Sequence, residues 1–387
     1  MSQSDNTKAS PPREAVSESG RHVRLFVDPY ADWAGEQKVP VHEDYGIDLR
    51  AVETAPWALY GTEGALVHLK GRGDFMTMFL LDLPEGGRTA QMRHLFEAVA
   101  YVIEGTGSTQ IETSDGRTHT FEWGPRSLFA LPLNVKYRVF NGSGRERARV
   151  VICNNFPLVK NLFHNDRLIF HHDFGFPERE GEAKYFAGDG DFIPGRPGWN
   201  LWETNFVPDV GASELHVWEQ RGAGSSNIQF LFTDAVMKAH CSAMPVGTYK
   251  KAHRHGPDFS IFHVSGSGYS LMWYEGATDF VRVDWRHGVV FAPPEMMFHQ
   301  HFNTGPEPAR YLAVALGSVQ HPFLTERKRQ LAGVDVDVKD GGRQIEYHDQ
   351  DPRIHATFLA ELARHGVQSR MGQYFDEAAL HEAVGSR

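Results

Sequence analysis

The chain has 387 residues, of which 41% are hydrophobic, 12% aromatic and 23% charged, and its net charge is −10. This length allows two or three domains. The sequence has no basic block and no apolar run of membrane-spanning length, which argues against nucleic-acid and membrane partners. Two cysteines, Cys153 and Cys241, are too few for a disulfide framework and are typical of a reducing compartment. We therefore expect a cytoplasmic globular protein.

The first segment, residues 1–22, is polar and contains no apolar stretch of the kind found in signal peptides. Its low hydrophobicity predicts a disordered tail.

Two parts of the chain repeat one pattern of glycine, histidine, proline and asparagine. Residues 83–107 align without gaps with 244–268, and residues 131–144 align with 293–306. The matched pairs are Gly86 and Gly247, His94 and His255, Gly105 and Gly266, Gly107 and Gly268, Pro132 and Pro294, and Asn141 and Asn303. The sequence therefore predicts a duplicated domain.

Each repeat consists of short runs rich in Val, Ile, Phe and Tyr that are separated by Gly, Pro and Asn. This pattern predicts an all-β-dominated protein. We expect one barrel at 60–155 and a second at 226–320. Between them, residues 156–225 are rich in Gly, Asp and Pro and are predicted to form a connecting arm.

Residues 321–387 are predicted to form a C-terminal extension that is partly helical. Ile354, Phe358 and Leu362 have the spacing of one helix face, and Asp351-Pro352 before them is a helix-start signal.

The motifs of both repeats resemble the two motifs of the cupin superfamily. The second repeat fills them with Gly247, His253, His255, Gly266, Pro294, His299 and Asn303, and the first with Gly86, His94, Gly105, Pro132 and Asn141. The resemblance implies a bicupin, with two double-stranded β-helix (jelly-roll) barrels in tandem, and it implies a homo-oligomer. It does not fix the reaction, because this fold hosts many activities.

The second repeat has the side chains of a metal site. Alternation along a strand places His253 and His255 on one face, and His299 comes from a later strand. Three imidazoles would leave open coordination positions on a divalent metal. The aligned residues of the first repeat are Met92, His94 and Tyr137. They make a poor site, so we expect the first barrel to be structural.

Further residues are candidates for catalysis or for the metal shell. His301 and His263 are predicted to face the same interior and to transfer protons, or else to be ordinary buried histidines. Phe259 occupies the position of the glutamate ligand that a cupin usually has. Asp258, next to it, would reach the metal only through a β-bulge.

The three-histidine set, followed by His301 and Asn303, is similar to that of gentisate-type ring-cleaving dioxygenases. In that family the well-formed site usually lies in the N-terminal cupin, whereas here it lies in the C-terminal one. The resemblance implies Fe(II) and O2 acting on a small hydroxylated aromatic acid or a related enolisable substrate, as in aromatic catabolism. Mn, Ni, Zn and Cu remain alternatives, because imidazole ligands suit several metals.

The substrate pocket is predicted to contain Phe259, Trp273, Met297 and Arg310, although barrel core and a solvated exterior would explain the same residues. Two alternative functions remain open. One is a non-oxidative metal-dependent lyase, decarboxylase or isomerase of a small acid. The other is a non-catalytic ligand-binding bicupin.

Overall fold

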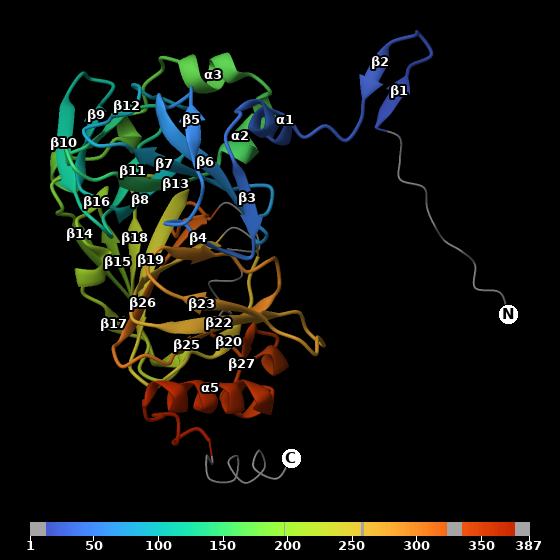
Figure 1. Cartoon of the computed structure of the whole chain (residues 1–387), viewed down its shortest axis with the longest axis vertical. Coiled ribbons are helices and arrows are strands. Elements are labelled where there is room, and N and C mark those ends of the chain that lie inside the picture. Colours follow the sequence, from blue (N-terminus) through green and yellow to red (C-terminus); the bar gives the residue numbers. More distant parts are fainter. Residues whose placement is uncertain (1–12, 197, 257–258, 323–334, 376–387) are drawn as a thin grey trace.

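β-Strands form most of the secondary structure of this protein, as the computed structural model in Figure 1 shows. The structure describes residues 13–196, 198–256, 259–322 and 335–375. Each repeat folds into a larger and a smaller sheet, and the two repeats lie one above the other in Figure 1. The predicted all-β class, with two barrels in tandem, is confirmed.

The first repeat has a larger sheet in the order β16-β11-β8-β13-β7-β6-β3, with β5 beside β6, and a smaller sheet in the order β10-β9-β12. Its strands are β3 (Val41–Asp44), β5 (Ala55–Trp57), β6 (Thr62–Leu69), β7 (Thr77–Leu83), β8 (Ala98–Glu104), β9 (Gly107–Glu112), β10 (Thr118–Trp123), β11 (Leu128–Leu131), β12 (Lys136–Asn141), β13 (Ala148–Asn154) and β16 (Phe206–Val207).

The second repeat has a larger sheet in the order β14-β15-β18-β19-β26-β21-β24-β4, with β17 beside β18, and a smaller sheet in the order β23-β22-β25-β20-β27. Its strands are β4 (Gly46–Asp48), β14 (Asp191–Arg196), β15 (Trp199–Glu203), β17 (His216–Val217), β18 (Ser226–Leu231), β19 (Met237–Met244), β20 (Ala252–His253), β21 (Phe259–Ser265), β22 (Gly268–Trp273), β23 (Val281–Trp285), β24 (Val289–Phe291), β25 (Phe298–Asn303), β26 (Ala309–Leu316) and β27 (Gln344–Ile345).

In the described part of the chain, three α-helices lie beside the first repeat and one lies beside the second (Figure 1). They are α1 (Pro29–Glu36), α2 (Phe156–Phe163), α3 (Asp166–His171) and α5 (Pro352–His365). Helix α5 begins at the predicted signal, where the Asp351 side chain accepts a hydrogen bond from the backbone N–H of Arg353. No helix of the described part of the chain is long and apolar enough to cross a membrane.

The N-terminal segment differs in part from the expected disordered tail. Residues 13–22 contribute to a hairpin of β1 (Glu14–Val16) and β2 (His22–Arg24), which projects from the rest of the molecule (Figure 1). Its turn is closed by Gly20, whose φ of 80° glycine adopts without strain. Residues 1–12 lie outside the described part.

The two repeats use their matched residues in the same way. The Asn141 amide donates hydrogen bonds to the carbonyl oxygens of Leu83, Pro84 and Glu146, and Asn303 donates to those of Met244, Pro245 and Glu307. These asparagines therefore pin the same loop in each barrel.

The barrels differ in their interiors and share a core. Aromatic side chains that include Trp57, Phe79 and Phe96 fill the first barrel. A separate apolar cluster, which contains Tyr101 of β8 and Phe262 of β21, joins the outer faces of the two larger sheets. The buried interface between the repeats is thus as much a core as either interior.

We predict that Gly266→Ala destabilises the protein more than Gly276→Ala does. Both glycines have left-handed φ values, +84° and +78°, so each substitution costs about 1–2 kcal/mol of backbone strain. An added Cβ at Gly266 would lie 2.6 Å from the Cα of Ala309, whereas Gly276 has nothing within 4 Å. Overpacking should add about 1–3 kcal/mol at Gly266 alone. Urea unfolding measures both changes, and equal losses would contradict the assigned contact.

Candidate metal centre

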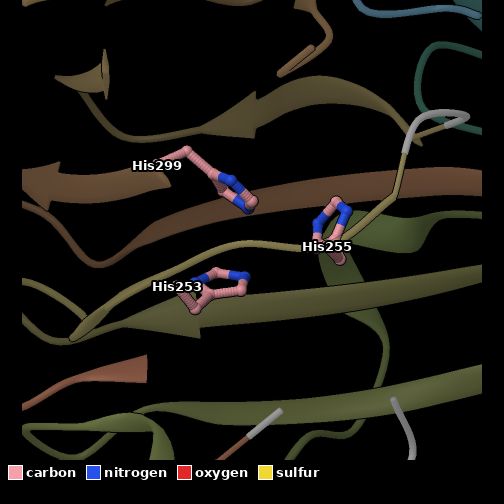
Figure 2. Close-up of side chains that lie close together, drawn as sticks. All are labelled: His253, His255 and His299. Carbon is pink, nitrogen blue, oxygen red and sulfur yellow. The ribbon is translucent and has the colours of Figure 1, made fainter. Parts of the chain in front are cut away.

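The smaller sheet of the second repeat brings three histidines together. Strands β20 and β25 pair antiparallel with His253 directly opposite His299, and their ring centroids are 4.1 Å apart. The ring of His255, two residues further along, lies 4.6 Å from that of His299. All three are buried, and one ring nitrogen of each lies within 4.8 Å of those of the other two. Figure 2 shows the rings facing a common space.

Backbone carbonyls fix the orientation of two of these rings. The Nδ1 of His255 lies 2.8 Å from the carbonyl oxygen of Gly256, and the Nδ1 of His299 lies 3.3 Å from that of Met297. A carbonyl oxygen only accepts hydrogen bonds, so each Nδ1 carries the proton and each Nε2 keeps its lone pair. Histidines that bind metals are commonly held in this way.

The electrostatics also favour neutral rings. Burial, and then the charge of Arg221, lowers the pKa of His253 well below its usual value. Burial lowers the pKa of His299 to about 3. The Nδ1 of His253 is buried and has no hydrogen-bond partner among the described residues. Three neutral imidazoles with converging nitrogens, one bearing an unsatisfied buried atom, fit a divalent transition metal.

The first repeat uses the equivalent positions differently. The Nδ1 of His94 donates to the carbonyl oxygen of Phe96 at 2.8 Å, which leaves its Nε2 as the acceptor for the Tyr137 hydroxyl at 3.1 Å. The Tyr137 hydroxyl also lies 3.4 Å from that of Tyr60. The single imidazole lone pair is thus already used, and the surrounding aromatic core leaves the site closed.

A cavity of about 120 Å³ adjoins the three histidines. It is lined by residues of the second barrel and of the segment between the repeats. They are Trp199, Trp218, Arg221, Gln229, Lys238, His240, Ser242, Lys250, His253, His255, Phe259, Ile261, His299, His301, Tyr311, Ala313, Gly317, Ser318 and Pro322. A cavity of comparable size, about 150 Å³, accommodates a benzene ring, so this one suits a small ligand.

Besides the three histidines, two of the predicted site residues line this cavity, Phe259 and His301. The Phe259 ring centroid lies 4.3 Å from that of His255. The Nδ1 of His301 lies 2.9 Å from the Ser270 hydroxyl, which also accepts a hydrogen bond from the Trp285 indole. His301 therefore has Nε2 left for a ligand.

Other predicted site residues lie elsewhere. His263 faces the barrel interior, but it packs against Trp285, with ring centroids 5.3 Å apart, and does not line the cavity. Trp273 packs against Phe280 and Phe298 on the outer face of its sheet, in the cluster that includes α5. The prediction about Asp258 lies outside the described residues.

Met297 and Arg310 are also absent from the described lining of the cavity. Met297 belongs to the apolar core of the second barrel. The Arg310 guanidinium donates to the carbonyl oxygens of Val210 and Ser213. Its charge is thus directed to backbone acceptors of the connecting segment.

Three cations of the cavity were missed by sequence reasoning: Lys238, Lys250 and Arg221. Lys238 has a readable signal, because Lys238, His240 and Ser242 alternate along β19 and all line the cavity. The sequence pattern around Lys250 is misleading. Strict alternation from His253 and His255 would point Lys251 inward, but β20 begins only at Ala252, and Lys251 pairs with Glu346 instead.

We predict that His299→Ala abolishes stoichiometric metal binding, whereas Tyr137→Phe at the aligned position of the first barrel leaves it intact. The reason is that, among the described residues, only those of the second barrel direct three imidazole nitrogens at one point. Elemental analysis after anaerobic Fe(II) loading and gel filtration measures the metal content. The same content in wild type and His299→Ala would refute the site.

No family model matches this chain, and neither does any curated protein. Solved structures that align with it include an oxalate decarboxylase formate complex from Lactobacillus farciminis, at 12% identity over 81% of this chain and 96% of that chain, with a TM-score of 0.48. The oxalate decarboxylase from Bacillus subtilis at pH 4.6 aligns at 13% identity over 84% of this chain and 94% of that chain, with a TM-score of 0.46. At such low identity the likeness does not extend to the reaction.

Proposed function

We propose that this chain is a metal-dependent enzyme that acts on a small organic acid. The observation that carries the proposal is the set of three buried imidazoles, His253, His255 and His299, whose ring nitrogens converge beside a cavity. Fe(II) is the metal that we propose, and Mn, Ni, Zn and Cu are the alternatives that such ligands accommodate.

The first candidate reaction is oxygen-dependent cleavage of a C–C bond in a small hydroxylated aromatic acid or a related enolisable substrate. Bound Fe(II), which three neutral ligands leave with its full charge, would supply Lewis-acid and oxygen chemistry to an anionic, oxygen-donating substrate. The absence of a carboxylate at position 259 supports this reaction, because Phe259 adds no negative charge and offers an apolar wall to a ring.

His301 is our candidate for proton transfer. Ser270 holds its Nδ1, and its Nε2 remains for a substrate in the cavity. Since the Trp285 indole donates to the same Ser270 hydroxyl and His263 packs on Trp285, we assign His263 a positioning role behind His301.

The second candidate is a non-oxidative lyase, decarboxylase or isomerase reaction, and one observation favours it. The Lys250 ammonium donates a hydrogen bond to the Tyr311 hydroxyl at 3.0 Å, and both residues line the cavity. Such reactions need a proton donor beside the carbon that loses its substituent. This pair would supply one without any O2.

We expect oxygen uptake by the Fe(II)-loaded protein with one member of a panel of hydroxybenzoates, hydroxynaphthoates, catechols and β-diketones. His253→Ala should lose this uptake, because it removes a ligand, whereas Tyr137→Phe in the filled first barrel should retain it. An oxygen electrode and product analysis measure the reaction.

The other outcomes separate the alternatives. Product formation without oxygen consumption would exclude the oxidative reaction and support the lyase, decarboxylase or isomerase. Metal-dependent binding of a panel member with no turnover would favour a non-catalytic ligand-binding protein.

A further inference from the structure

A second cavity, of about 360 Å³, lies at the rim of the first barrel. Its volume is in the range of ligand pockets, about 300–1,000 Å³. The described lining comes from the turn after β5, the segment before β8, the start of β12 and the end of α3. It consists of Leu59, Gln91, Met92, Arg93, Lys136, Phe170 and His171. None of these residues lines the cavity beside the three histidines.

Arg93 is the half-buried cation of this cavity. Its Nη2 donates to the carbonyl oxygen of Asn134 across 3.4 Å, which is long for a hydrogen bond. Its Nε is buried and has no hydrogen-bond partner among the described residues, and none of their carboxylates forms an ion pair with it. A guanidinium has five N–H donors. Most of the binding capacity of this side chain is therefore unused within the described part of the chain.

The second repeat shows how an arginine at this position can be satisfied within the chain. Arg254 is the residue aligned with Arg93. Its guanidinium pairs with Glu275 at 2.7 Å and lies 4.5 Å from the centre of the Phe298 ring. The residue aligned with Phe298 is Lys136. The first repeat thus has a second cation where the second repeat has the ring on which its arginine packs.

The charges around the cavity leave one positive charge without a counter-charge. The described lining contains Arg93 and Lys136 and no aspartate or glutamate. Lys136 pairs at 2.6 Å with Glu112, which lies opposite it on β9. The charge of Arg93 remains. A single negative charge would balance it, whereas a phosphate monoester carries about 1.5–2 negative charges.

We propose that this cavity binds a monocarboxylate that carries an apolar group. The carboxylate lies at Arg93, whose planar guanidinium matches it in charge and geometry. The apolar group packs against Leu59, Met92 and Phe170, the apolar part of the lining. This site is separate from the proposed function, because it uses no residue of the second barrel.

Met92 provides a local readout of binding. It lines this cavity, and the described lining of the cavity beside the three histidines contains no methionine. The methionine methyl groups of the full-length protein are labelled with ¹³C, and the NMR signal of Met92 is assigned by its loss in Met92→Leu. Titration of this signal measures affinity at the first barrel even if the same compound also binds at the second.

We expect phenylacetate to shift the Met92 signal and to bind about tenfold or more tightly than phenylacetamide, its neutral analogue of similar shape. This is the change expected for one charge-assisted hydrogen-bonded contact. Acetate should bind more weakly than phenylacetate, because it has no ring to bury. Equal affinities for phenylacetate and phenylacetamide would overturn the proposal. Tighter binding of phenyl phosphate would overturn the assignment of a single negative charge.

Matched variants locate the carboxylate. Arg93→Gln removes the charge and should weaken phenylacetate binding about tenfold or more. Arg88→Gln removes an exposed charge of the same segment, outside the described lining, and should leave the affinity unchanged. If Arg93→Gln does not fold, as judged by circular dichroism, Lys136→Gln replaces it, because it leaves Glu112 to oppose the anion and should also weaken binding. Unchanged affinity in the folded cavity variant would refute the site.

One further variant separates this site from the metal centre. His299→Ala removes a candidate metal ligand of the second barrel and should leave the response of Met92 to phenylacetate unchanged. A response lost together with the metal would contradict the placement of the ligand at the first barrel.

Discussion

The antiparallel pairing of β20 with β25 is the interaction on which the rest of the site depends. It places His253 opposite His299, and His255 follows before the chain turns away. Because β20 is only two residues long, it has little hydrogen bonding of its own to hold it. Its other edge is covered by β27, where Gln344 pairs with His253 and also accepts a hydrogen bond from Arg221. The C-terminal extension therefore supports both the histidines and a cation of the cavity.

The two repeats share one backbone arrangement, but the side chains inside the two barrels differ. The same asparagine pins the same loop in each, through Asn141 and Asn303. In the first barrel, however, the imidazole of His94 is stacked on Phe96 and accepts a hydrogen bond from Tyr137. Aromatic volume there replaces the space that a ligand would need. Close packing of this kind stabilises the fold and leaves no room for a ligand, whereas the second barrel has a cavity beside polar groups.

Much of the architecture and the core of the candidate site could be predicted from the sequence. The repeated glycines and asparagines predicted the duplication, and the period of two along a strand predicted that His253 and His255 would share a face. Two of the three cations of the cavity, Lys250 and Arg221, could not be predicted in the same way. Lys250 lies just before β20 begins, where alternation no longer applies, and Arg221 lies in a segment without periodicity. Trp273, which the sequence analysis places in the pocket, lies instead on the outer face of its sheet, where it packs in the cluster that includes α5. No local sequence pattern reveals which face of a sheet a distant helix will cover.

The pairing of β4 with β24 has a consequence for the order of assembly during synthesis. Gly46 of β4 lies beside Phe291 of β24, so an early segment of the chain must wait for a late one before this sheet edge is complete. Gln344, which pairs with His253 at the other edge of β20, is synthesised later still. Contacts so distant in sequence form slowly, because a long loop must close first. The nascent chain can therefore build and fill its first barrel while the histidines of the second are still unsupported, and a metal held by these histidines would bind only after β27 has paired with β20.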